Sequence, residues 1–131
     1  MKHAIVIGSG PAGLMAADEL SRAGAKVTVL EAKPSLGRKF LMAGKSGLNL
    51  TKSEPIDAFT KHYTDAEGWL APMLTAFGSK QVQEFANGLG QSVFVGSSGR
   101  VFPKAMKASP MLRAWLLRLS ERGVTFKTSQ R

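Results

Sequence analysis

The first 31 residues constrain the fold most, because they alternate apolar runs with a glycine turn in a fixed order. Residues 4–7 (AIVI) are apolar and β-branched, which is typical of a buried parallel strand. The turn 8–13 (GSGPAG) leads into residues 14–24, whose apolar side chains keep helical spacing and whose last residue is glycine, a helix-stop signal. Residues 27–31 (VTVLE) form a second apolar run that closes on an acid. The order predicts a βαβ unit, and hence an α/β, Rossmann-like dinucleotide-binding domain.

Three glycines in this turn have separate roles in dinucleotide binding. Gly8 permits the tight turn off the strand, Gly10 lets the backbone approach a diphosphate, and Gly13 allows the helix to pack closely on the sheet. The diphosphate then lies on the positive end of the helix. Glu31 ends the second strand, where it would accept both ribose hydroxyls and disfavour a 2′-phosphate. The alternative is a structural βαβ corner with no ligand.

The residues after Glu31 bear on whether the cofactor is FAD or NAD, since both present the same adenosine diphosphate. The run 31–39 (EAKPSLGRK) continues through a proline-containing loop to Gly37, Arg38 and Lys39. A second glycine and two cations there can reach the same cofactor again, and adjacent cations offset a diphosphate charge. This arrangement resembles the FAD site of the glutathione-reductase-type flavoproteins. A domain binding NAD alone is the second hypothesis.

The tripeptide Gly44-Lys45-Ser46 has the ending of a nucleoside-triphosphate P-loop, but the rest of that motif is missing. The first P-loop glycine would have to stand at position 39, which is Lys39. A P-loop also follows a buried strand and opens a helix, whereas residues 38–43 (RKFLMA) before this tripeptide predict a short helical turn. The sequence therefore argues against a P-loop.

Residues 1–52 and 99–116 together resemble the bacterial BaiN-like flavoproteins, also described as NAD(P)/FAD-dependent oxidoreductases of the aminoacetone-oxidase type. Members have Gly-Arg-Lys after the ribose acid and then a serine- and glycine-rich loop ending in Cys-Asn-x-Thr-Asn. In this chain the matching positions are Gly37, Arg38, Lys39, Gly44, Gly47, Asn49 and Thr51. Leu48 stands where the family usually has cysteine, and Lys52 where it often has asparagine, so the substrate class is left open.

The resemblance implies that the loop wraps the ribityl and flavin part of FAD, with Arg38 and Lys39 near its phosphates. It also implies that the whole enzyme passes electrons from NAD(P)H through FAD to an unidentified acceptor. No catalytic residue can be named. Asn49 is open between a flavin contact and a turn-capping role. The predicted cofactor-binding residues are Gly8, Ser9, Gly10, Pro11, Ala12, Gly13, Glu31, Ala32, Gly37, Arg38, Lys39 and Asn49.

Beyond the loop, the pattern predicts a helical segment, a hairpin, a helix and a strand. The helices are expected at 66–77, with a break near Pro72, and at 79–90, followed by a hairpin of 92–95 with 100–102, a helix over 109–123 and a strand over 124–128. Ser79 and Ser109 are the expected N-caps. The apolar residues Trp69, Leu70, Met73, Leu74 and Phe77 keep helical spacing and are predicted to be core.

Composition narrows the class of protein. The 131 residues contain no cysteine, which excludes disulfides and thiolate metal sites and suits the cytoplasm, and no apolar run is long enough for a membrane span. The net charge of +9 is concentrated in residues 33–52 and 100–131. A basic nucleic-acid-binding module is a third hypothesis, ranked last because aromatic residues make up only 8% and no such motif is present.

We expect a single, incomplete FAD/NAD(P)-binding domain over 1–131, with a dinucleotide-binding part (1–52), a helical part (53–90) and a hairpin, helix and strand (91–131). Members of the resembled family continue into an adenine-contacting segment, a substrate domain and a C-terminal Gly-Asp segment. The chain is therefore expected to be a fragment, inactive alone and a weak binder of FAD at best.

Overall fold

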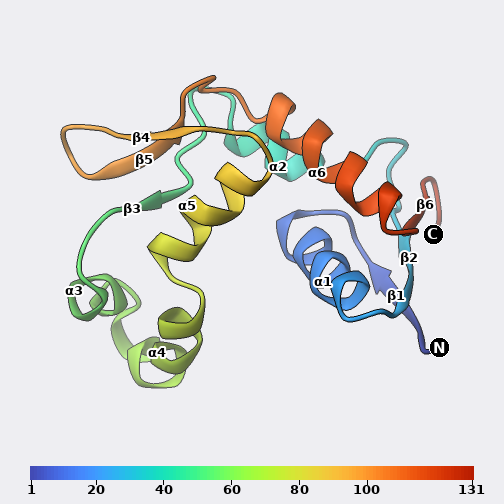
Figure 1. Ribbon diagram of the computed structural model, residues 1–131, viewed down its shortest axis with the longest axis horizontal. Coiled ribbons are helices and arrows are strands. Elements are labelled where there is room, and N and C mark those ends of the chain that lie inside the picture. Colours follow the sequence, from blue (N-terminus) through green and yellow to red (C-terminus); the bar gives the residue numbers. More distant parts are fainter. The chain divides into compact units, whose positions relative to one another are not determined.

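The computed structural model describes all residues, 1–131, and these fall into two units (Figure 1). The first comprises residues 1–45 and 108–131, and the second comprises residues 46–107. This grouping differs from the sequence-based parts 1–52, 53–90 and 91–131, because the chain leaves the first unit after Lys45 and returns to it at Ala108.

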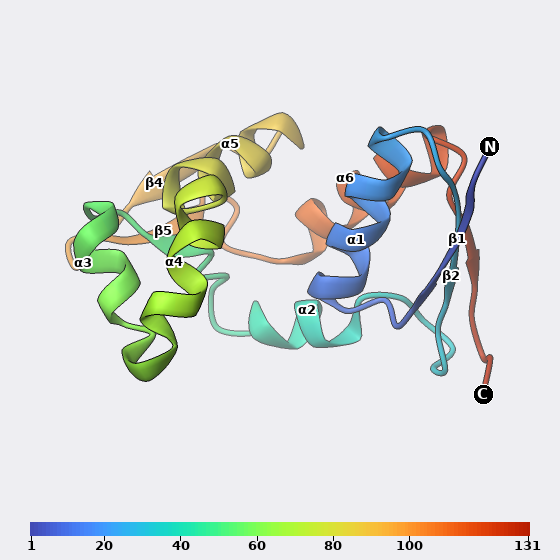
Figure 2. The same cartoon turned by 90° about the horizontal axis from the view of Figure 1, so that it is seen from below.

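The first unit is built on a parallel sheet with the strand order β1-β2-β6. Its strands are β1 (His3–Ile7), β2 (Lys26–Leu30) and β6 (Thr125–Lys127), and its helices are α1 (Pro11–Arg22), α2 (Arg38–Ala43) and α6 (Ser109–Glu121). The connection from β1 through α1 to β2 confirms the predicted βαβ unit, with Val6 opposite Val29 in the register. Helices α1 and α6 lie on one face of the sheet (Figure 2). The apolar core residues include Leu14, Ala17, Val27, Val29, Phe40, Met111, Leu112, Trp115 and Leu119.

A buried acid joins α1 to α6. Asp18 is only 4% exposed, and its carboxylate accepts hydrogen bonds from the Trp115 indole (2.8 Å) and from Arg122 (2.9 Å). Arg118 lies 3.5 Å from the same carboxylate. The carboxylate is thus compensated by charge and hydrogen bonds, as a buried charge requires. Part of the positive charge of the C-terminal segment therefore has a structural partner.

The second unit contains a small antiparallel sheet and four helical segments. The sheet has the order β3-β5-β4, with β3 (Thr51–Lys52), β4 (Val93–Val95) and β5 (Arg100–Pro103), so the predicted hairpin is confirmed. The pairing of β3 with β5 was not predicted. The helices are α3 (Ile56–Lys61), the 3-10 turn η1 (Thr64–Ala66), α4 (Glu67–Ala76) and α5 (Ser79–Gly88).

Helix α4 contradicts two expectations. The helix continues without interruption across Pro72, so the predicted break is absent. None of its residues is buried, and Trp69 is 71% exposed, Met73 49% and, just beyond the helix, Phe77 42%. The prediction of a core stripe is wrong because helical spacing identifies an apolar face without showing what covers it.

Both predicted N-caps are displaced by one residue. Helix α5 has Gly78 at the N-cap position, and the Gly78 N–H donates to the side-chain oxygen of Gln81 at 3.0 Å. Helix α6 has Ala108 there, with Pro110 in its first turn. Ser79 and Ser109 are therefore the first helical residues, and neither helix has a side-chain hydrogen bond from the N-cap residue itself. No helix combines the length and apolar character that crossing a bilayer demands.

Candidate dinucleotide-binding site

The turn after β1 has the geometry that the glycine spacing predicts. Gly8 has a left-handed φ of +98°, and its N–H donates to the Leu30 carbonyl at 2.8 Å. A Cβ at Gly13 would lie 2.0 Å from the Gly8 carbonyl oxygen, so any side chain there would force α1 away from the turn. A Cβ at Gly10, by contrast, would meet nothing within 4 Å. Gly8 and Gly13 are therefore required by the backbone geometry of the turn, whereas Gly10 faces open space.

The N-terminus of α1 is available to an anion. Gly10 is the N-cap residue and provides no side-chain acceptor, Pro11 stands in the first turn, and no acid occurs there. The first N–H groups of a helix have no partner within it, and they carry the positive end of its dipole. Ala12 and Gly13 contribute such groups. This 12-residue helix can therefore offer N–H donors to a diphosphate.

A cavity of about 460 Å³ opens at this turn. It is lined by Gly8, Ser9, Gly10, Glu31, Lys33, Arg38, Lys39 and Met42. Three cations and one acid thus surround it, and its volume falls in the range of small-molecule sites, about 300–1,000 Å³. The arrangement complements a ligand that carries both a diphosphate and a hydroxylated sugar.

Glu31 lies at the mouth of the turn, directly after β2. Its carboxylate Oε1 accepts the Ser9 N–H at 3.1 Å and also the Ser9 hydroxyl, and Oε2 accepts the Lys33 N–H at 2.9 Å. The Lys33 N–H and then the Ser9 hydroxyl hold the pKa of Glu31 below its ordinary value, because both hydrogen bonds favour the charged form. The group is thus a carboxylate near neutral pH.

Gly37 belongs to the support of the site and does not line the cavity. It is buried, has a left-handed φ of 67° and precedes α2, and a Cβ there would lie 2.7 Å from a Leu112 methyl carbon. Its N–H donates to the Ser9 hydroxyl at 3.1 Å. Arg38 and Lys39 follow on the exposed first turn of α2 and do line the cavity.

Six predicted residues lie outside this cavity lining, namely Pro11, Ala12 and Gly13 in the first turn of α1, and Ala32, Gly37 and Asn49. Ala32 is exposed beside Glu31. Asn49 belongs to the second unit, where its side-chain amide donates to the carbonyls of Thr51 (2.9 Å) and Val101 (3.2 Å). These bonds agree with the turn-stabilising alternative, and the flavin contact of Asn49 stays a prediction. Gly44 ends α2, which agrees with the argument against a P-loop.

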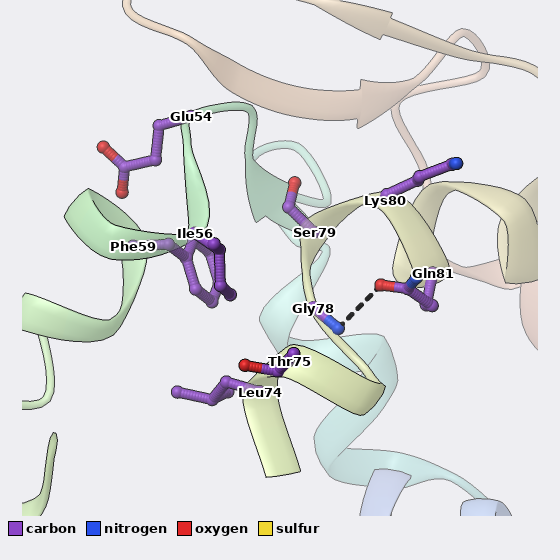
Figure 3. A pocket seen from close by; sticks show the side chains of 9 residues that line it. All are labelled: Glu54, Ile56, Phe59, Leu74, Thr75, Gly78, Ser79, Lys80 and Gln81. Carbon is purple, nitrogen blue, oxygen red and sulfur yellow. Dashed lines mark hydrogen bonds between the residues drawn. The ribbon is translucent and has the colours of Figure 1, made fainter. Parts of the chain in front are cut away.

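The second unit has a cavity of its own, of about 260 Å³, between α3 and the junction of α4 with α5 (Figure 3). Its walls include the apolar side chains of Ile56, Phe59 and Leu74. Glu54 points away from these side chains in Figure 3, and its Oε1 lies 2.7 Å from Nε2 of His62. The start of α5 and one cation, Lys80, also belong to this wall. The cavity nevertheless lacks the glycine turn between a parallel strand and its helix and the three cations of the first, so the cavity at the β1–α1 turn is the candidate site.

Comparison with known proteins agrees with this geometry. Residues 2–131 match the HI0933-like protein Rossmann domain. The chain belongs to this family. It is thus an FAD-binding Rossmann domain of the flavin-dependent oxidoreductase type, as the resemblance to BaiN-like flavoproteins predicted.

Two relatives match nearly half of this HI0933-like chain, which spans only a small part of their own length. The ribosomal RNA dihydrouridine synthase of Haemophilus influenzae is 42% identical over 59 residues, which are 45% of this chain and 14% of that protein. The sarcosine oxidase subunit alpha of a Corynebacterium species is 39% identical over 64 residues, 48% of this chain and 7% of that protein. The crystal structure of Thermovibrio ammonificans THI4 has a TM-score of 0.59 at 18% identity, and the match covers 98% of this chain and 38% of THI4. The last match shows the fold alone.

Two residues of the cavity wall in this HI0933-like domain were not predicted from the sequence. Lys33 and Met42 line the cavity but were not assigned to it. The sequence gives little indication that these two residues line a site, because Lys33 precedes a proline-containing loop and Met42 is one apolar residue of a short helix. Ser9 was predicted as a cofactor contact from its place in the motif, and its bonds to Glu31 and Gly37 could not be seen in the sequence.

Proposed function

We propose that the cavity at the β1–α1 turn holds the adenosine diphosphate part of FAD. The supporting observation is the Glu31 carboxylate beside an uncapped helix N-terminus, with Lys33, Arg38 and Lys39 on the same cavity wall. The diphosphate would lie against Gly10 and the first turn of α1, and the ribose against Glu31. Bound FAD supplies hydride and electron transfer, and the chain's own residues supply binding and orientation.

We further propose that the whole protein is an oxidoreductase that passes electrons from NAD(P)H through FAD to an acceptor. This proposal draws on the family and on the names of the relatives. The chain spans only 14% and 7% of the two relatives described above, so the activity of the whole protein is a proposal. The cations Arg38 and Lys39, which line the cavity, disfavour a domain that binds NAD alone. Competition of FAD and NAD for labelled ADP would separate these ligands.

Calorimetric titration of the chain with ADP tests the site directly. We expect binding that weakens with added salt, because cations contribute to it, and that is lost in Glu31→Ala and in Arg38→Ala/Lys39→Ala. Lys61→Ala, an exposed cation of the second unit, is the control. Absence of ADP binding at millimolar concentration would contradict the proposed function. Visible flavin absorbance after gel filtration then tests the expectation that the chain alone holds FAD weakly.

A second candidate is that the electron acceptor is a base in RNA. It rests on the 42% identity to a ribosomal RNA dihydrouridine synthase and on the net charge of +9. Retention of a structured RNA with a steep, linear dependence on the logarithm of salt concentration would favour it. Equal retention of heparin would indicate positive charge alone.

A further inference from the structure

Ser9 is fully buried between three segments that meet at the candidate site. Its hydroxyl donates to Oε1 of Glu31, at the end of β2, and accepts the N–H of Gly37, before α2. Its own backbone N–H donates to the same Oε1 at 3.1 Å. One side chain therefore links the glycine turn, the ribose acid and the start of the basic helix.

Counting hydrogen bonds on Glu31 shows how much of this acid is left for a ligand. A carboxylate has about four acceptor positions, two on each oxygen. Oε1 already takes both donors of Ser9, and Oε2 takes the Lys33 N–H. The Ala32 N–H also favours the charged form of this carboxylate. At most one acceptor position is left for a ligand hydroxyl, on Oε2, whereas the sequence led us to expect that the acid accepts both hydroxyls of the ribose.

We propose that Ser9 is a positioning residue, whose buried hydroxyl fixes the Glu31 carboxylate so that Oε2 alone accepts a single ribose hydroxyl. This inference rests on the proposed nucleotide site. Ser9 itself does not contact the sugar in this arrangement. It sets the direction of the carboxylate and ties that direction to Gly37, so the acid and the cations of α2 keep a fixed relation.

The variant Ser9→Ala removes the hydroxyl and keeps the backbone donor. Ser35→Ala is the matched control, because Ser35 is exposed in the loop between Glu31 and Gly37. Ser9→Cys, with a similar volume and a weak donor, serves as a second variant if the alanine variant does not fold. The first measurement is the titration of the Glu31 carboxyl carbon by NMR, which needs no ligand.

We expect the pKa of Glu31 to rise in Ser9→Ala, to rise less in Ser9→Cys and to stay unchanged in Ser35→Ala. The cause is loss of a hydrogen bond that favours the carboxylate. An unchanged Glu31 titration in Ser9→Ala would overturn the inference, whatever the chain binds. A residue with only a packing role would not move this titration selectively.

The second measurement compares ADP with 2′-deoxy-ADP and 3′-deoxy-ADP. In the wild type, removal of one hydroxyl should weaken binding about tenfold or more and removal of the other less than about twofold, since a lost hydrogen bond to a charged group costs about 1.5 kcal/mol or more. In Ser9→Ala the two analogues should bind within about twofold of each other. Equal sensitivity to both hydroxyls in the wild type would overturn the single-hydroxyl assignment. Failure of ADP itself to bind would contradict the proposed function, and the NMR titration would still decide the role of Ser9.

Discussion

Two alanine substitutions in the glycine turn separate folding from ligand binding. In Gly13→Ala the new Cβ would lie 2.0 Å from the Gly8 carbonyl oxygen, where ordinary contact begins at 3.4 Å. The atom in the way is backbone, so α1 or the turn must move by more than 1 Å. Overpacking of this kind costs about 1–3 kcal/mol, and we expect the upper end of that range because no side chain can rotate aside.

Gly10→Ala should leave the free energy of unfolding nearly unchanged. Its backbone, with φ −72° and ψ −179°, is open to alanine, and its Cβ would meet nothing within 4 Å. Alanine makes the unfolded chain less flexible, which raises the free energy of unfolding slightly, but alanine is also a poorer N-cap residue than glycine, which lowers it. We therefore expect a net change within about 0.5 kcal/mol. The new methyl group would nevertheless occupy the surface proposed for the diphosphate. ADP binding should weaken about tenfold or more.

The assay is urea unfolding followed by fluorescence of the tryptophans, paired with calorimetric titration of ADP on the folded variants. Gly13→Ala should shift the unfolding midpoint strongly, and Gly10→Ala should shift ADP affinity alone. Wild-type ADP affinity in Gly10→Ala would refute the placement of the diphosphate. Wild-type stability in Gly13→Ala would refute the close approach of α1 to the turn.

Three further outcomes can be measured on the same chain. Asp18→Ala should lower the free energy of unfolding by about 3–5 kcal/mol, since it removes the acid from a buried ion pair, whereas Glu19→Gln, which removes an exposed ion pair with Arg22, should leave it almost unchanged. Because the pKa of Glu31 is lower in the folded state, this carboxylate stabilises the fold above its unfolded pKa, near 4.5, and the stabilisation is lost as the pH falls through the folded pKa. In Glu31→Gln the free energy of unfolding should therefore fall less steeply as the pH is lowered. Trp69→Ala should cost less than about 1 kcal/mol by urea unfolding, and Trp115→Ala about 3–5 kcal/mol; similar costs for both would show that α4 is covered.

The βαβ unit could be predicted because its signals are local. A β-branched run, a glycine turn with defined spacing and an amphipathic segment each indicate one element, and their order leaves few alternatives. The same holds for helix α6, where the sequence predicts a proline-containing start and an apolar stripe of Leu112, Trp115, Leu116 and Leu119. All of these but the half-buried Leu116 are buried. Glycines 24 and 123 end their helices with left-handed φ values of 92° and 84°, as expected for C′ positions.

Other features depend on contacts between distant residues and leave no local pattern. Asp18 reads as one polar residue of an amphipathic helix, yet its partners stand 97 to 104 positions later. Strand β3 has two residues, too few for any period, and it exists because Thr51 pairs with Val101. Exposure of Trp69 likewise depends on what packs against α4, which helical spacing cannot show.

The ribose acid shows why the motif alone does not make the site. Glu31 is held on one side by Ser9 of the glycine turn and on the other by the last strand, where its N–H donates to Lys127 (2.8 Å) and its carbonyl accepts the N–H of Gln130 (2.9 Å). The main-chain position of the acid is thus set by residues almost a hundred positions away, and only its carboxylate direction is set within the motif. The main chain at Glu31 is thus held by β6 as well as by the pairing of β1 with β2. We expect a shorter chain with the same glycine pattern but without β6 to keep the turn and to hold the acid less firmly.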